Sequence, residues 1–258
     1  MKKNVKYILL IIICISSFYF TEKIALYVKM RNPIIKDINS IKNDKYTEYT
    51  NCLLIDENYI IPGLNGREIN IDKSFRQMKN STVFNEDLLV YNQIIPQNSL
   101  ENNKDRIIIR GNSKKNNVSL IFSSDNNLAK YMQKNNYIVN VLIDKEIYPS
   151  NYELINNAHS KDTYTKIEKT LNKNKLNNNL CYTKNDNIPK YCKDKYLFKE
   201  SLIINHSNLS QTINKIKNGE IILIENSLTI EELNVLLKQI KYQSLSIVPL
   251  SKLISETN

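Results

Sequence analysis

The sequence holds few side chains that could support metal-dependent chemistry. Its two histidines, His159 and His206, lie far apart in the chain. No H-x-x-x-H pair therefore exists to place two imidazoles one helical turn apart around a metal ion. A site of one aspartate and two histidines would form only if the fold joined these two residues. The cysteines have no C-x-x-C spacing either. The sequence predicts no metal ion and no other cofactor.

Hydrolysis without a metal needs an activated nucleophile or a pair of carboxylates. Ser123 and Ser124 are adjacent, but no G-x-S-x-G turn surrounds them and no partner histidine is assignable. Asp125 and Glu225 could form a carboxylate pair of the kind that glycosidases use. The simpler interpretations are an inactive, filled-in pocket at the serines and a surface or hydrogen-bonded position for Glu225. We therefore name no catalytic residue.

The elements that would position these residues follow one another from residue 118 onward. Val118–Phe122, Tyr137–Ile143 and Glu220–Ile224 are apolar runs with the length of buried strands. Amphipathic stretches lie between them, and Thr229–Glu232 is a T-x-x-E capping box that opens a helix. Such alternation predicts a parallel sheet with right-handed crossovers, either open or closed into a barrel.

Composition and charge exclude some classes of function. The chain has 258 residues, of which 41% are hydrophobic and 24% charged, as in an ordinary folded protein. Its net charge is +10, but the basic residues are scattered and form no dense stripe, which argues against nucleic-acid binding. The charge favours contact with an anionic surface. The four glycines form no Gly-rich phosphate loop, which excludes nucleotide binding of that kind.

The N-terminal segment has the pattern of an export signal. Three lysines precede the fourteen-residue apolar run Tyr7–Phe20 (YILLIIICISSFYF). This length lies between a signal-peptide core and a full membrane span. No A-x-A-like cleavage site follows, so we expect an uncleaved transmembrane anchor with the C-terminal part outside. A cleaved signal is the alternative. Export would permit a disulfide between Cys181 and Cys192, and unpaired thiols are the other possibility.

These features together resemble the polysaccharide (chitooligosaccharide) deacetylase family over residues 118–256. The family opens with a strand that ends T-F-D-D-G, where this chain has Ile121–Asp125 (IFSSD). It closes with a strand of the form G-x-I-I-L-L-H-D and a segment F-V-T-L-S-E-L-I. The corresponding segments here are Gly219–Asn226 (GEIILIEN) and Ser246–Ile254 (SIVPLSKLI). Ile60–Glu68 is similar to the accessory region of membrane-anchored members from low-GC Gram-positive bacteria.

The resemblance implies an active-site position without the residues of the enzyme. Family enzymes use one aspartate as a base, and a second aspartate with two histidines of H-x-x-x-H to hold a divalent metal. Ser123 and Ser124 stand at the two aspartate positions, and at best His159 remains of the histidine motif. Glu225 stands where the family has the histidine that acts as general acid. The Arg-Pro-Pro-Tyr motif falls near Leu180–Thr183, which lacks arginine. The resemblance therefore implies vestigial active-site positions at Ser123, Ser124, His159 and Glu225.

The predicted fold is an α/β deacetylase-type (β/α) barrel, shortened or partly open, with a small β-rich accessory subdomain and one transmembrane helix. The predicted boundaries are 1–28 for the anchor, 29–50 for a polar stalk, 51–112 for the accessory subdomain and 113–258 for the deacetylase-like domain. We expect a non-catalytic envelope protein at the cell membrane, with its C-terminal domain extracytoplasmic. It would bind cell-wall or surface polysaccharide, or act as a scaffold. The alternatives are an active carbohydrate deacetylase or hydrolase with substituted residues, and a basic module that binds anionic wall polymers.

Overall fold

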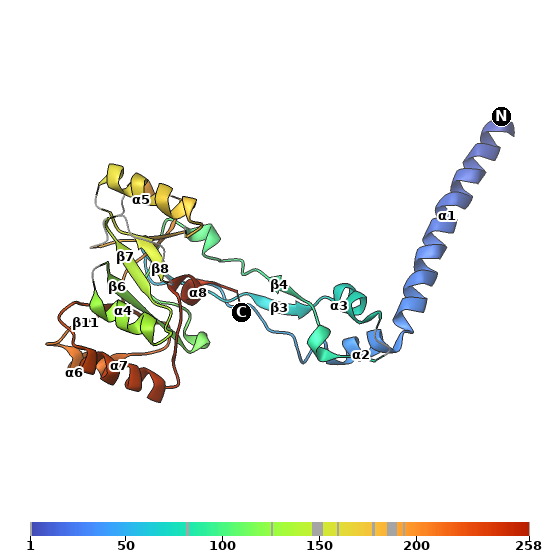
Figure 1. Ribbon diagram of the computed structural model, residues 1–258. Helices are drawn as coiled ribbons and strands as arrows, with labels where there is room; N and C mark the ends of the chain where they lie inside the picture. Colours follow the sequence, from blue (N-terminus) through green and yellow to red (C-terminus); the bar gives the residue numbers. More distant parts are fainter. Residues whose placement is uncertain are drawn as a thin grey trace. The chain divides into compact units, whose positions relative to one another are not determined.

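The computed structural model divides the chain into two compact units (Figure 1). It describes residues 2–80, 83–124, 126–145, 152–158, 160–176, 179–184, 190–192 and 194–257. The first unit comprises Met1–Glu48 and Gly66–Ile94, and the second comprises Tyr49–Asn65 and Ile95–Asn258. Each unit has its own hydrophobic core.

The first unit combines helices with a two-stranded antiparallel sheet. Its elements are α1 (Lys2–Met30), α2 (Pro33–Ile41), β3 (Gly66–Ile69), α3 (Ile71–Met78), the 3₁₀ helix η1 (Glu86–Leu88) and β4 (Tyr91–Ile94). The strands β3 and β4 pair antiparallel, and Ile38 of α2 and Met78 of α3 are fully buried in the core of this unit. The alternation of short apolar runs predicts a strand at Leu88–Tyr91. The strand instead begins at Tyr91, because η1 precedes it and is capped by the Asn85 side chain.

The predicted export segment forms α1, which is 29 residues long. Its side chains from Ile11 to Phe20 are all exposed. Among the residues that the structure describes, no helix is long and apolar enough to cross a membrane. The predicted transmembrane helix is therefore not found. The apolar run Tyr7–Phe20 is followed at once by a threonine, Glu22 and Lys23, and it is shorter than the roughly 17–25 residues of a span.

The second unit contains two largely parallel sheets. Their strands are β1 (Leu53–Leu54), β2 (Tyr59–Ile61), β5 (Ile107–Ile108), β6 (Asn117–Ser123), β7 (Asn140–Ile143), β8 (Glu153–Asn156), β9 (Leu180–Tyr182), β10 (Tyr196–Phe198), β11 (Leu202–Ile204), β12 (Ile221–Ile224) and β13 (Ser246–Ile247). One sheet has the order β11-β12-β6-β7-β8, with β13 beside β6, and all its pairs are parallel. The other has the order β1-β2-β5-β10-β9, in which only β1 is antiparallel to its neighbour. The prediction that residues 118–122, 137–143 and 220–224 contribute to one parallel sheet is confirmed, by β6, β7 and β12.

Helices follow the strands in the alternating order that the sequence predicts. They are α4 (Asn127–Lys134), α5 (Lys161–Lys173), α6 (Leu209–Thr212), α7 (Ile230–Tyr242) and α8 (Leu250–Ile254), with 3₁₀ helices η2 (Glu101–Asn103), η3 (Ser113–Lys115), η4 (Lys190–Cys192) and η5 (Ile213–Lys215). The predicted capping box of α7 is present, with Thr229 and Glu232 each bonded to the backbone of the other. Gly219, before β12, has φ +87°, a conformation that favours glycine.

The central strand β6 of the second unit buries both of its faces. Successive strand side chains point to opposite sides of a sheet. In β6, Leu120 and Phe122 belong to the core cluster that includes residues of α4, α5 and α7, whereas Ile121 lies in a different cluster. That second cluster also contains Ile108 and Phe198 of the other sheet. The two sheets therefore share an inner core.

One disulfide lies in the second unit, between Cys181 of β9 and Cys192 of η4. The two Cα atoms are 5.9 Å apart, which is within the usual range for a disulfide. The sequence left this pair undecided, and the structure forms it. Cys52 is free and buried, and Cys14 is free and exposed.

Candidate functional site

The carboxyl ends of β12, β6 and β7 bring together three of the four predicted site residues. Ser123 is the last residue of β6, Ser124 follows it, and Glu225 follows β12, the parallel neighbour of β6. In open α/β sheets and barrels, functional side chains lie at this edge. His159 and Asp125, which the sequence also singled out, lie outside the described residues.

Each serine at this edge has a hydrogen-bond partner from a neighbouring strand end. The Ser123 Oγ donates to Oδ1 of Asn226 at 2.9 Å, and the Ser124 Oγ donates to Oδ1 of Asp144 at 3.1 Å. An amide oxygen is a poor proton acceptor, so Asn226 cannot activate Ser123 as a nucleophile. Asp144 fixes the Ser124 hydroxyl but supplies no imidazole to relay a proton.

Asp144, Asn226 and Asn205 are site residues that the sequence analysis missed. Asn205 follows β11, and its Nδ2 donates to Oε2 of Glu225 at 3.0 Å. Asp144 directly follows β7, Asn205 directly follows β11, and Asn226 is the second residue after β12. A polar residue at the end of an apolar run was the signal that could have found them. Together with Ser123, Ser124 and Glu225 they form what we call the strand-end cluster, whose side chains are exposed or half-exposed.

His206 lies next to the strand-end cluster but is held by another residue. Its Nδ1 is 2.6 Å from Oε1 of Glu232, in the first turn of α7. The pKa of the Glu232 carboxyl is lowered, chiefly by the hydrogen bond from the backbone N–H of Thr229; burial opposes this shift, and the hydrogen bond with His206 adds to it. The carboxylate therefore caps α7 and bonds the imidazole, and in the part of the chain that the structure describes His206 bonds neither serine.

The described residues do not fit a divalent metal ion at this edge. Within the ranges that the structure describes, no three His, Cys, Asp or Glu side chains gather closely enough to hold a metal. Ser123 and Ser124 offer neutral hydroxyls, which do not offset the charge of a dication as carboxylates do. The arrangement instead provides hydroxyl, amide and carboxylate groups that can exchange hydrogen bonds with a polar ligand.

The segment 180–183, predicted near the family's arginine motif, is buried in the structure. Leu180–Tyr182 forms β9, and Cys181 is in the disulfide. The Tyr182 hydroxyl donates to Oε2 of Glu200 at 2.7 Å, and burial raises the pKa of this phenol. These residues contribute to the core rather than to the strand-end cluster.

Comparison with known proteins identifies similar folds but no close relatives. No model of a protein family matches the chain, and no curated protein matches it in sequence. Wild-type BA3943, a CE4 family pseudoenzyme from Bacillus anthracis, matches with a TM-score of 0.60 and 16% identity, over 87% of this chain and 96% of that one. A BA3943 mutant matches with a TM-score of 0.61 and 16% identity, over 87% and 98%. Another BA3943 mutant, described as having restored enzymatic activity, matches with a TM-score of 0.55 and 15% identity, over 87% and 99%. At these identities the likeness shows the fold alone, which is α/β with parallel sheets as predicted.

Proposed function

We propose that this chain is a non-catalytic, deacetylase-like protein of the cell envelope that binds glycan at the strand-end cluster. The hydrogen bonds of Ser123 and Ser124 to Asn226 and Asp144 are the observation that carries the proposal. Ser123 and Ser124 stand at the positions where the resemblance implies a base and a metal ligand. Their hydroxyls provide neither. The fold that the chain shares with a CE4 family pseudoenzyme supports the same conclusion.

The chemistry of the cluster favours a sugar as its ligand. Asp144, Asn205, Glu225 and Asn226 offer carboxylate and amide groups at one accessible edge, next to two serine hydroxyls. Sugar hydroxyls both donate and accept hydrogen bonds, and such groups match them. Each neutral hydrogen bond contributes only about 0.5–1.5 kcal/mol net, so binding through this edge is expected to be weak.

The purified protein should bind an acetylated chitooligosaccharide without hydrolysing it. Asp144→Ala and Asn226→Ala should each weaken binding of tetra-N-acetylchitotetraose about fivefold or more, since each removes a group that can bond the sugar. Asp105→Ala is the matched control, because Asp105 is an exposed carboxylate before β5, outside the cluster. Titration followed by NMR measures the affinities of the unsubstituted protein and of the three variants. Equal affinities for all variants would contradict the proposed binding edge.

Acetate release is the measurement that separates this proposal from an active deacetylase. Positioned general acids and bases each supply about 10²–10⁴-fold in rate, and a metal supplies the activated water. A chain that lacks all of these groups should release no acetate from the same oligosaccharide, with or without added Zn²⁺, Co²⁺ or Mn²⁺. Metal-dependent release that His159→Ala abolishes would establish the active enzyme instead.

We also propose that α1 attaches the protein to the outer face of the membrane. Three lysines precede its apolar run, and the exposed fractions of Ile11, Phe18 and Phe20 are 56%, 75% and 63%. Large apolar side chains at such exposure favour transfer out of water. After cell fractionation, full-length protein should remain with membranes in high salt and be accessible to external protease. A shortened soluble form would show that the segment is a cleaved signal.

A further inference from the structure

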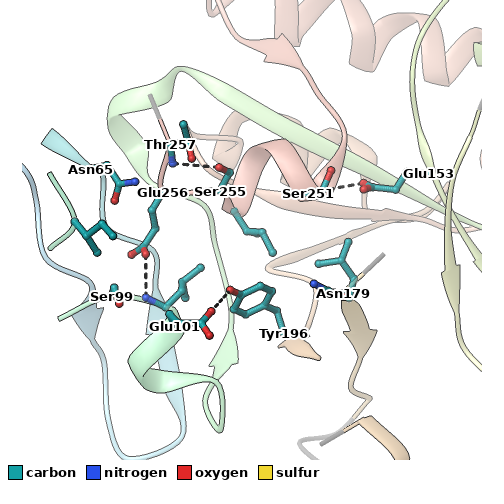
Figure 2. Close-up of a pocket in the computed structure, with 14 residues that line it drawn as sticks. Asn65, Ser99, Glu101, Glu153, Asn179, Tyr196, Ser251, Ser255, Glu256 and Thr257 are labelled. Atoms are coloured by element: carbon teal, nitrogen blue, oxygen red, sulfur yellow. Dashed lines mark hydrogen bonds between the residues drawn. The ribbon is translucent and has the colours of Figure 1, made fainter. Parts of the chain in front are cut away.

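A cavity lies at the end of the strands opposite to the strand-end cluster. Glu153 begins β8 and Tyr196 begins β10, and both line this cavity together with Asn179 and Leu180 at the start of β9. The C-terminal segment 251–257 and the residues 99–101 complete its wall (Figure 2). All of the lining residues belong to the second unit. The volume is about 590 Å³, which is within the range of pockets that bind small molecules.

One part of the cavity wall is apolar. Leu100, Leu180 and Ile254 are buried side chains of this wall, and Tyr196 adds an aromatic ring. The Tyr196 hydroxyl donates to Oε2 of Glu101 at 2.8 Å, as the dashed line in Figure 2 shows. Burial, followed by that hydrogen bond, raises the pKa of this phenol to about 12, so the ring stays neutral. A ring or short aliphatic body could pack on this surface.

The other part of the wall carries three carboxylates. Glu101 pairs with Lys104, whose Nζ is 2.5 Å from Oε1. Within the described ranges, Glu256 accepts its hydrogen bonds from neutral donors, among them the backbone N–H of Leu100 at 3.1 Å. Glu153 accepts one, from the N–H of Ser251 to Oε2 at 3.1 Å, and its Oε1 has no bond within the described part of the chain.

The lining therefore has a surplus of negative charge. Of its carboxylates, only Glu101 has an ion pair among the described residues. Lys115 does not line this cavity, but it bonds the carbonyl oxygens of Ser255 and Thr257, and its charge partly offsets that of the Glu256 carboxylate. An anion would be repelled here, and a neutral ligand would shield the carboxylates from water without compensating their charge. A cation would satisfy them.

We propose that this cavity binds a small organic cation, with its ammonium group at Glu153 and its ring or aliphatic body against Tyr196 and Leu100. Two independent observations carry this assignment: the apolar and aromatic wall, and the Glu153 carboxylate, which has no cation beside it among the described residues. The site is separate from the strand-end cluster, which lies at the carboxyl ends of the strands. Its occupation therefore requires neither glycan binding nor any activity at the serines.

Benzylamine, benzyl alcohol and benzoate test the proposal, because they share a ring and differ in charge. Calorimetric or NMR titration of the full chain should give saturable benzylamine binding, at least tenfold tighter than benzyl alcohol and weakened by salt. Benzoate should not bind. Equal affinity for amine and alcohol, tighter binding of benzoate, or no binding of benzylamine would overturn the proposal.

Two variants locate the ammonium group. Glu153→Gln keeps a carbonyl acceptor for the N–H of Ser251 but removes the charge, so benzylamine affinity should fall at least fivefold while benzyl alcohol affinity is unchanged. Glu231→Gln removes an exposed carboxylate of α7 and should change neither affinity. Thermal unfolding of both variants verifies that they are folded. Benzylamine binding that is unchanged in folded Glu153→Gln would refute the assignment.

Discussion

Replacing Asn140 by leucine is expected to lower the free energy of unfolding by about 3–5 kcal/mol. Asn140 lies in β7 with an exposed fraction of 0%. Its Nδ2 donates to the Ser119 Oγ at 2.7 Å and to the Leu120 carbonyl oxygen at 2.8 Å, and its Oδ1 accepts from the N–H of Leu250 at 2.8 Å. Leucine has a similar volume but makes none of these bonds. Each buried polar group that loses its partner costs about 1–3 kcal/mol.

The same substitution should loosen the C-terminal segment. Ser119 donates to the Val248 carbonyl oxygen at 3.0 Å, so Ser119 and Asn140 together bond residues 248 and 250 to the strands. Denaturant unfolding and hydrogen exchange at the Leu250 amide measure the two effects. Asn127→Leu, at an exposed position of α4, is the control and should change stability by less than about 0.5 kcal/mol. A stable Asn140→Leu variant with a protected Leu250 amide would contradict this account.

The elements predicted from the sequence are those with a continuous apolar pattern. Residues 118–122 and 220–224 are long apolar runs, and the capping box marks α7 directly. The strands β9 and β10 have only three residues each and lie among polar segments, so their pattern is too short to separate from a loop. The helix α5 was missed although its signal exists, since Tyr164, Ile167 and Leu171 have helical spacing and are buried.

The two candidate sites differ in how far a sequence can predict them. Ser123 ends one strand with a strong apolar pattern, and Glu225 directly follows another. Because parallel strands end at the same edge of a sheet, the sequence alone predicts that these two residues lie at one edge. The cavity at the opposite end depends on Glu101, Glu153 and Glu256, which are remote in sequence and converge only after the two sheets have formed around their inner core. No local pattern indicates that convergence.

Glu256 joins three remote segments of the second unit, and its replacement by alanine should also have a large effect. Its Oε1 accepts from the Gly63 N–H at 3.1 Å and from the Cys52 Sγ at 3.0 Å, and its Oε2 accepts from the Leu100 N–H. Alanine removes the acceptor of the Leu100 N–H and of the Cys52 thiol, and leaves the Gly63 N–H only its longer bond to the Cys52 Sγ at 3.3 Å, which should lower the free energy of unfolding by about 3 kcal/mol or more. Glu256→Gln retains one carbonyl oxygen, so its loss should be intermediate. Equal stability of the three proteins would contradict the account.

The reactivity of Cys52 reports the same contact independently of stability. Burial, followed by the hydrogen bond to Glu256, raises the pKa of this thiol from its ordinary 9.0 to about 12. The folded state therefore retains a proton that the unfolded state loses above about pH 9, so this contribution to stability is present below pH 9 and lost as the pH rises towards 12.

In a Cys14→Ser background, Glu256→Ala removes one cause of the raised pKa and opens access to the thiol. Labelling of Cys52 by a disulfide reagent at pH 8 should then be at least tenfold faster, because the thiolate is the reactive form. Unchanged labelling would show that burial alone protects Cys52.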